Sequence, residues 1–200
     1  MNLFKYWHIS LLFLFVSCTQ TRESNKSNND MENKINALLG QMTLEEKIGQ
    51  MNQISPWGDP AQTADLVRKG EVGSILNITD PVALNALQEV AMEESRLKIP
   101  LIVGRDVIHG FKTIFPIPLG QAASFNPEMI QEGARIAAIE ASPQGIRWTF
   151  APMIDIARDP RWGRIAESLG EDTYLTSVLG AAMIKGFQGY NLNAPTSIAA

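Results

Sequence analysis

FAPMIDIARDPRWGRIAESLGEDTYLT, residues 150–176, begins as an apolar run and turns polar at Asp155. Arginines, aspartates and glutamates then follow closely, and Pro160 and Gly163 bend the backbone between them. A strand that ends in such a charged loop is typical of a binding site at the mouth of a rigid scaffold. The stretch therefore predicts both a strand of the fold and a place where function lies.

A second apolar run leads into polar residues in the same way. Residues 99–104, IPLIVG, have the continuous hydrophobicity of a strand buried on both faces of a parallel sheet, and RDVIHG follows at 105–110. Further strands are predicted at 71–77 and 148–156, and a loop at 54–60. Helices are predicted around them at 61–69, 81–96, 126–141 and 171–186. The alternation indicates βαβ units on a parallel sheet.

The residues in the turns of this sheet help to predict whether it is an open sheet or a closed barrel. They carry no glycine fingerprint for phosphate binding, which disfavours a dinucleotide-binding fold. The favoured fold is α/β, a (β/α)8 barrel of the TIM type, in which sites lie at the C-terminal ends of the strands. Because a whole barrel takes about 250 residues, residues 31–200 are expected to form its N-terminal part, incomplete in this chain. The last residues, NAPTSIAA, resemble the beginning of another strand.

Helix caps support these boundaries. Thr43 and Glu46 have the spacing of a capping box, and Leu44, Ile48 and Met51 fall on one face of the helix that follows. That helix is expected to pack on another element. A capping residue followed by proline begins the helices predicted at 81 and 127.

The N-terminus has the pattern of a secretory signal. Residues 1–18, MNLFKYWHISLLFLFVSC, carry one positive charge, at Lys5, and an apolar stretch too short to span a bilayer permanently. Ser17 and Cys18 are similar to the end of a bacterial lipoprotein signal, which predicts a lipid on Cys18; the alternative is a plain signal peptide with an incidental thiol. Residues 19–30 have no apolar side chain and are expected to form a polar tether.

We therefore expect an exported protein, in the periplasm or at the outer membrane, whose only contact with the membrane is the lipid anchor at Cys18. Without Lys5 the chain has 16 basic and 21 acidic residues, a net charge of −5. A mildly acidic chain without basic runs is not expected to bind nucleic acid. With His109 as the one histidine after the signal, a transition-metal site lacks ligands, so neither a metal nor another cofactor is expected.

Asp106 directly follows the buried strand at 99–104, with Arg105 beside it. At the mouth of a barrel its carboxylate can accept hydrogen bonds from the paired hydroxyls of a sugar; the alternative role is to cap the following turn. His109 has the chemistry of a base, although a hydrogen-bonded core histidine is the favoured interpretation.

In the charged loop, Arg164 is the arginine best suited to a polyol or carboxylate partner, because its donors form a rigid fork. Trp162 either stacks on a sugar or packs in the loop, and packing is favoured. The remaining charged side chains are interpreted as structural. A salt-bridge cluster is expected of Arg158, Asp159 and Arg161, and helix capping or internal pairing, in place of a catalytic carboxylate pair, of Glu167, Glu171 and Asp172.

Five motifs together resemble glycoside hydrolase family 3, in particular its periplasmic β-glucosidases. They are DVIHG at 106–110, TIFPIPLG at 113–120, AASFN at 122–126, FAPMIDIARDPRWGR at 150–164 and ESLGEDTYLT at 167–176. The resemblance covers residues 35–200. It implies a retaining, exo-acting glycosidase that removes a non-reducing terminal β-linked sugar from an oligosaccharide or a β-glucoside.

The resemblance also implies roles for single residues. Asp106 would bind hydroxyls of the terminal sugar, and Arg164 would belong to the same subsite. The family's Lys-His pair, aspartate nucleophile and acid/base glutamate come later in its sequences, and none lies within residues 1–200, so no catalytic residue is assigned here. A retaining mechanism needs two carboxyl groups about 5–5.5 Å apart, and residues 19–200 alone are therefore expected to be inactive and poorly folded.

The same motifs bear on the other activities of the family. Members of the family that act as β-N-acetylhexosaminidases carry an acidic, double-glycine motif where this chain has DVIHG, which disfavours that activity. A β-xylosidase or arabinosidase of the same family remains an alternative. So does a lipid-anchored sugar-binding protein without catalysis, which a nucleophile aspartate after a Lys-His pair would exclude. The oligomeric state is left undetermined.

Overall fold

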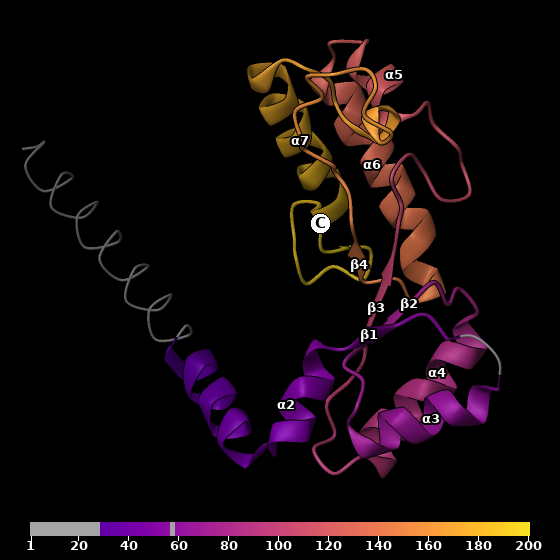
Figure 1. Cartoon of the computed structure of the whole chain (residues 1–200), viewed down its shortest axis with the longest axis vertical. Coiled ribbons are helices and arrows are strands. Elements are labelled where there is room, and N and C mark those ends of the chain that lie inside the picture. The colour runs from indigo at the N-terminus through magenta and orange to yellow at the C-terminus, as the bar shows by residue number, and fades with distance from the viewer. Residues whose placement is uncertain (1–28, 57–58) are drawn as a thin grey trace, which may run out of the picture. The chain divides into compact units, whose positions relative to one another are not determined.

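The computed structural model describes residues 29–56 and 59–200 (Figure 1). The predicted signal peptide with Cys18 and the tether up to residue 28 lie outside the described residues. The chain forms two compact units, one ending at Lys47 and the other spanning Ile48–Ala200. Residues 29–41 are helical, so the last two residues of the predicted tether already belong to a helix that the sequence did not predict. No helix in the described ranges is long and apolar enough to cross a membrane.

Helix α2, Leu44–Met51, begins at the predicted capping box. The backbone N–H of Thr43 donates to Glu46 Oε2 at 2.8 Å, and the N–H of Glu46 donates to Thr43 Oγ1 at 3.2 Å. The predicted packing of its apolar face was wrong for the described chain, since Leu44, Ile48 and Met51 are all more than half exposed. The helix does pack on another element, as predicted, but through Gly49, where an added Cβ would lie 1.9 Å from the Gly70 carbonyl oxygen. The capping bonds are local and fix where the helix begins.

Four parallel strands form one sheet in the order β1-β2-β3-β4. They are β1 (Gln53–Ile54), β2 (Ser74–Leu76), β3 (Ile102–Arg105) and β4 (Trp148–Thr149). Strand β1 lies partly where the sequence predicted a loop. The order has no reversal, unlike that of a doubly wound dinucleotide-binding sheet, and is that of successive barrel strands.

A fifth segment pairs at the edge of this sheet. Ala199 forms a parallel bridge with Trp148, the N–H of Thr149 donates to the Ala199 carbonyl at 2.8 Å, and the N–H of Ala199 donates to the Arg147 carbonyl at 2.9 Å. The prediction that the last residues begin another strand is confirmed.

The predicted helices are present, and their caps follow the sequence. They are α3 (Pro60–Lys69), α4 (Pro81–Glu89, continued by a π-helical turn, Val90–Glu94), α6 (Pro127–Ala141) and α7 (Thr173–Gln188). Asp59, Asp80, Asn126 and Asp172 accept hydrogen bonds at their N-termini. A short helix that the sequence did not predict, α5 (Pro118–Ala122), follows the proline-rich extended segment.

The two faces of the sheet differ in burial. Ile75 and Val103, which are partners in the β2–β3 register, are 0% and 3% exposed. Ile75 packs in a cluster with residues of α3 and α4. Ile102 points to the opposite face, because side chains alternate along a strand, and it is 52% exposed. One face is therefore covered by helices, and the other is still accessible at Ile102.

Gly104 shares the accessible face with Ile102. A Cβ at this position would lie 3.0 Å from the Phe150 ring and 3.4 Å from Gln53 Nε2. The Phe150 ring packs in turn on Trp148, with 4.6 Å between ring centroids. The Gln53 amide nitrogen is buried and has no hydrogen-bond partner in the described part of the chain. Side chains from β1 and from the end of β4 thus converge over a glycine of β3, as in the packed interior of a barrel.

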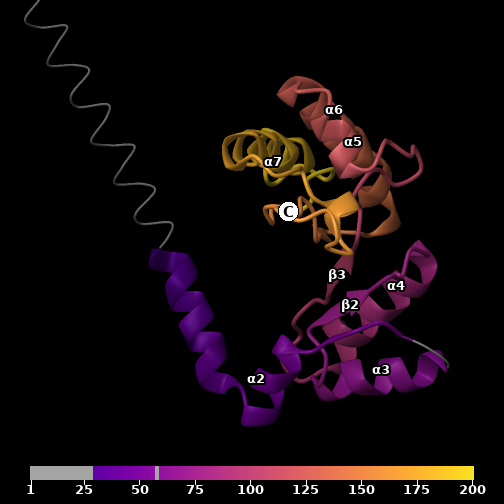
Figure 2. The ribbon, with the colours of Figure 1, turned by 45° about the horizontal axis from the view of Figure 1, so that its top comes forward.

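Helices α6 and α7 lie side by side in both ribbon views (Figure 1, Figure 2). Small residues along α6 let the two helices approach closely. At Gly186 of α7, an added Cβ would lie 2.3 Å from the Gln131 carbonyl oxygen and 2.6 Å from the Ala134 Cβ. The buried cluster around this contact includes Ala134, Ala137, Ala138 and Ala141 of α6 and Leu179, Met183 and Phe187 of α7.

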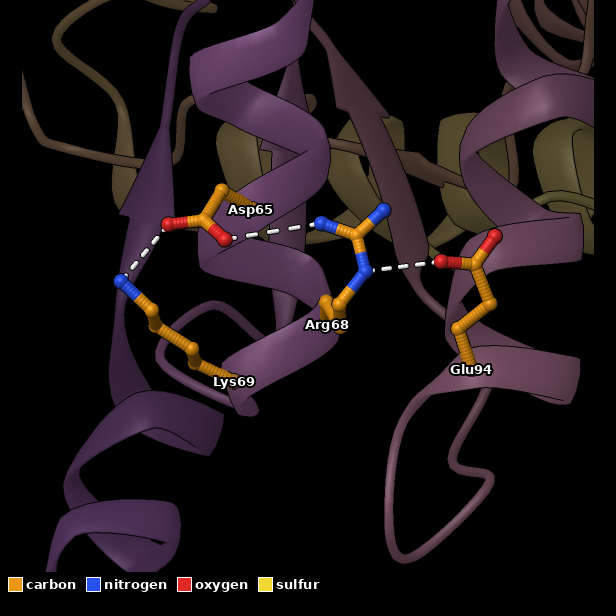
Figure 3. Close-up of polar contacts among 4 residues, drawn as sticks. All are labelled: Asp65, Arg68, Lys69 and Glu94. Atoms are coloured by element: carbon orange, nitrogen blue, oxygen red, sulfur yellow. Dashed lines mark hydrogen bonds and ion pairs between the residues drawn. The ribbon is translucent and has the colours of Figure 1, made fainter.

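Four charged side chains link α3 to the π-helical turn (Figure 3). Arg68 donates through Nε to Glu94 Oε2 at 2.7 Å, and Asp65 pairs with Lys69 at 2.6 Å and with Arg68 at 3.5 Å. The hydrogen bond from Lys69 lowers the pKa of Asp65. All four side chains are between 43% and 55% exposed, so solvent screens the network and its contribution to stability is small.

The close approach of α6 and α7 predicts that Gly186→Ala destabilises the full-length protein. The added methyl group meets backbone and cannot be relieved by a side-chain rotation, so a loss of about 1–3 kcal/mol in the free energy of unfolding is expected. Gly40→Ala is the matched control, because Gly40 is also helical and has nothing within 4 Å of an added Cβ. Urea unfolding measures both, and equal midpoints for the two variants would contradict the packing described.

Candidate active-site residues at the strand ends

The loops that follow β3 and β4 begin at the same edge of the sheet. Gly104 and Arg105 pair with Trp148 and Thr149 in parallel register, so both strands end together. In Figure 1 the chain continues from the tips of both arrows into long loops. The first loop carries Asp106, and the second carries Asp155 and Arg164. This is the edge at which α/β barrels build their sites.

Asp106 is the first residue after β3, and its side chain is exposed. Within the described residues its carboxylate makes no hydrogen bond, so in this structure it does not cap the following turn. The next residue is firmly held: Val107 is fully buried, and its N–H donates to Thr149 Oγ1 at 3.2 Å. Asp106 therefore projects a carboxylate from backbone that is anchored to the end of β4.

Arg105 lies between the ends of two strands. Its Nη1 group donates to Asn77 Oδ1, just after β2, at 3.4 Å. The guanidinium carbon lies 5.9 Å from the centre of the Phe111 ring, a cation–π contact. Because Arg105 is engaged by these two neighbours, it links the β2 end to the loop that Asp106 begins.

His109 is half-buried and hydrogen-bonded, as the favoured interpretation predicted. Its Nδ1 lies 3.0 Å from the carbonyl oxygen of Phe115, and the N–H of Phe115 donates to the His109 carbonyl at 2.8 Å. A carbonyl oxygen only accepts, so Nδ1 carries the proton of this contact. This tautomer and the reciprocal backbone bond are those of a histidine that closes a loop.

Arg164 is held by Glu167, one helical turn further on. The Nε group donates to both carboxylate oxygens of Glu167, and Nη2 donates to Oε2 at 2.8 Å. These bonds raise the pKa of Arg164 and lower that of Glu167. Nη1 makes no hydrogen bond to any described residue. The predicted internal pairing of Glu167 is confirmed, and it orients the Arg164 guanidinium with one nitrogen group remaining for another partner.

Two further carboxylates act on the same guanidinium. After the contribution of Glu167, the charges of Asp155 and Asp106 also raise the pKa of Arg164. Asp106 and Arg164 come from different loops and are 58 positions apart in the sequence, yet the fold brings them within electrostatic range. The sequence did not predict Asp155 as a site residue. Its place after the apolar run at 150–154 is like that of Asp106 after the run at 99–104, and this similarity could have indicated it.

Other charged side chains of this loop form local bonds. Asp159 accepts hydrogen bonds from both the N–H and the Nε of Arg161 at 2.9 Å, which confirms this pair of the predicted cluster. Arg158, the third predicted member, forms no ion pair with them in the described chain, and the Glu171 carboxylate likewise accepts no hydrogen bond there, so these two parts of the prediction were wrong. Asp172 caps α7 by accepting from the N–H of Leu175 at 2.7 Å. Trp162, for which packing was favoured, is half-buried, and Trp148 packs on Phe150.

Two groups at this edge of the sheet have unused hydrogen-bonding capacity within the described residues. The exposed Asp106 carboxylate offers acceptors, and Arg164 Nη1 offers donors. In the described ranges, no group of three or more histidine, cysteine, aspartate or glutamate side chains is placed to hold a metal ion. A groove of about 470 Å³ between α3 and α4 and another of about 410 Å³ beside α5 are lined mainly by apolar residues. Neither is lined by Asp106 or Arg164, although residues of the charged loop between 157 and 175 form part of the second.

The anchoring of Val107 generates a prediction. Thr149→Val keeps the shape of the side chain but leaves the buried Val107 N–H without an acceptor, so a loss of about 1–3 kcal/mol in unfolding free energy is expected in the full-length protein. Thr149→Ser retains the hydroxyl and should lose clearly less. Urea unfolding of both variants tests this, and a Thr149→Ser variant that is less stable than Thr149→Val would show that the methyl group, not the hydrogen bond, matters.

Comparison with known proteins gives a consistent relationship. Residues 43–197 match the model of the glycosyl hydrolase family 3 N-terminal domain. A periplasmic β-glucosidase of Salmonella typhimurium is 47% identical over 154 residues, covering 76% of this chain and 20% of that protein. A putative β-xylosidase of Formosa agariphila is 33% identical over 202 residues, covering 88% of this chain and 27% of that protein.

Solved structures agree. A β-glucosidase from Listeria innocua in complex with isofagomine superposes with a TM-score of 0.75 at 41% identity, covering 84% of this chain and 25% of that one. An exo-1,3/1,4-β-glucanase from Pseudoalteromonas superposes with a TM-score of 0.69 at 30% identity, covering 84% of this chain and 23% of that one. The chain thus spans about a fifth to a quarter of the length of these relatives.

Proposed function

This chain belongs to glycosyl hydrolase family 3, and on that premise we propose that it forms the N-terminal part of the catalytic barrel of a retaining, exo-acting β-glycosidase. The substrate class is a β-glucoside or an oligosaccharide with a non-reducing terminal β-linked glucose. The named activities of the Salmonella and Listeria relatives support this proposal. So does the parallel sheet, whose strand order is that of the first strands of a barrel.

One observation carries the proposal for the sugar site: Asp106 and Arg164 lie on the two loops that follow the paired strands β3 and β4 at one edge of the sheet, close enough for the charge of Asp106 to raise the pKa of Arg164. In the described chain, neither the Asp106 carboxylate nor Arg164 Nη1 has a hydrogen-bond partner. A terminal sugar between them donates hydroxyl protons to Asp106 and accepts from Arg164. Glu167 holds Arg164 in place, so the sugar meets an oriented donor.

The catalytic carboxyl groups are proposed to come from residues that follow this chain. Retaining hydrolysis needs a nucleophile and an acid/base. Glu167 is engaged by Arg164, which lowers its pKa, and Asp172 caps α7, so both are committed to structural roles. Residues 31–200 would bind and orient the terminal sugar, and purified residues 19–200 are expected not to hydrolyse it.

A β-xylosidase is the second candidate, because relatives from Formosa agariphila that are 33% and 31% identical carry that name. The two substrates differ by the hydroxymethyl group that glucose carries and xylose lacks. A comparison of kcat/KM for an aryl β-glucoside and an aryl β-xyloside in the full-length protein decides between them. The primary proposal predicts preference for the glucoside.

Replacing the two proposed sugar-binding residues tests the site. In the full-length protein, Asp106→Ala and Arg164→Ala are each expected to lower kcat/KM for an aryl β-glucoside by about 10²–10³-fold, the loss typical of a polar contact that strengthens in the transition state. Asp65→Ala and Arg68→Ala are matched controls, since they remove an exposed carboxylate and an exposed guanidinium on α3. Unchanged kcat/KM in both site variants would refute the assignment.

We also propose that the protein is exported and anchored by a lipid at Cys18, in the periplasm or at the outer membrane. The signal pattern of residues 1–18 supports both export and the lipid, and the periplasmic relative supports export. Cys18→Ala is expected to move the full-length protein out of the membrane fraction, because the thiol that carries the lipid is lost. Ser17→Ala, which keeps a small residue before the cysteine, is the control. A wild-type protein that is already soluble after export would contradict the anchor.

A further inference from the structure

The loop that begins with Asp106 is hydrogen-bonded to one carboxylate of helix α6, that of Glu140. Glu140 Oε2 accepts hydrogen bonds from the backbone N–H groups of Lys112 and Thr113, both at 2.8 Å. Glu140 Oε1 accepts from the Thr113 hydroxyl at 2.6 Å. Three donors from two adjacent residues therefore converge on one side chain. Because the acceptor is ionised, these bonds are stronger than neutral ones.

The environment keeps this acceptor charged. The hydroxyl bond from Thr113, followed by the backbone bonds, lowers the pKa of the Glu140 carboxyl below its ordinary value. Glu140 is also half-buried near the C-terminal end of α6, whose neighbouring residues Ala138 and Ala141 are fully buried in the main core cluster. We call the Glu140 carboxylate and its three donors from Lys112 and Thr113 the clamp. Glu140 lies on α6, which is fixed by its packing in the core, so the clamp holds the loop to a rigid helix.

Further contacts inside the loop connect Lys112 and Thr113, which Glu140 holds, to Asp106. Phe111, next to Lys112, lies under the Arg105 guanidinium. The reciprocal bonds of His109 and Phe115 close the middle of the loop. Gly110 has a φ of +111°, and a Cβ there would lie 2.0 Å from the Thr113 carbonyl oxygen, so the turn is tight.

We infer that Glu140 is a positioning residue for Asp106: it fixes the tip of the Val107–Phe115 loop, while the Val107–Thr149 bond fixes its base, and together they hold the Asp106 carboxylate toward the sugar. The inference rests on the proposed function, because Asp106 has a sugar to bind only if that function is right. Glu140 itself touches neither sugar nor reacting atoms. Its effect on activity therefore passes through Asp106.

If Glu140 acts only through Asp106, a double-mutant cycle in the full-length protein should show that the two substitutions are not additive. Glu140→Ala should lower kcat/KM for an aryl β-glucoside by about 10–100-fold, because a small displacement of a positioned group costs this much. In the Asp106→Ala background, the same change should cost less than about threefold, since the residue it positions is already gone. Glu140→Gln, which keeps one amide oxygen as acceptor, should lie between Glu140→Ala and wild type.

The controls separate positioning from loss of stability. Glu132→Ala removes an exposed carboxylate from the same helix and should leave kcat/KM within about twofold. All variants are assayed well below their unfolding midpoints. An activity of Glu140→Ala within about twofold of wild type would overturn the inference. Equal losses from Glu140→Ala in the wild-type and Asp106→Ala backgrounds would overturn it too.

Hydrogen exchange distinguishes failure of this inference from failure of the proposed function. The amides of Lys112 and Thr113 should exchange roughly tenfold faster or more in Glu140→Ala than in wild type, as the loss of a hydrogen bond to a charged group implies. If wild type hydrolyses no β-glycoside but these amides respond, the proposed function is wrong and the clamp is right. If the amides do not respond, the clamp itself is wrong.

Discussion

Parallel pairing of β3 with β4 is the constraint on which the proposed site depends. Parallel strands end at the same edge of a sheet, so the pairing brings the loop that begins at Asp106 beside the loop that carries Arg164. The hydrogen bond from the Val107 N–H to Thr149 Oγ1 ties the start of the first loop to the last residue of β4. Side chains alternate between the two faces along a strand. Gly104 lies on the face that carries the Phe150 ring and leaves room for it. Asp106 comes two residues later, beyond the end of β3.

The carboxylates of these loops and of α6 divide into those that form hydrogen bonds within the described chain and those that do not. Three carboxylates accept hydrogen bonds from their own loop or helix: Asp159, Glu167 and Asp172. A fourth, Glu140, accepts from Thr113 in the Val107–Phe115 loop. Asp106 has no such partner in the described chain. This division explains why the stretch with the highest density of charge, residues 150–176, contributes one proposed sugar contact, Arg164, and otherwise supports it.

Local signals predicted much of this from sequence. Caps such as Asp80 and Asn126 are short-range hydrogen bonds, and the buried runs at β2 and β3 identify their strands, so both could be predicted. Strand β1 could not, because two residues flanked by polar side chains show no period, and only pairing with β2 makes them a strand. The three bonds of Glu140 join positions 27 or 28 residues apart, and no pattern of spacing reveals them. The likeness of the chain to family members implied that Asp106 and Arg164 share one subsite, whereas the bond from the Val107 N–H to Thr149, which anchors the loop of Asp106, required the fold.

The central claim is that Asp106 and Arg164 hold one and the same sugar ring. A crystal structure of the full-length protein with bound glucose or gluconolactone tests it most directly. The account predicts that the Asp106 carboxylate and Arg164 Nη1 both lie within about 2.7–3.2 Å of oxygens of a single ring at the C-terminal edge of β3 and β4. A ring bound elsewhere, or one contacted by neither side chain, would contradict it.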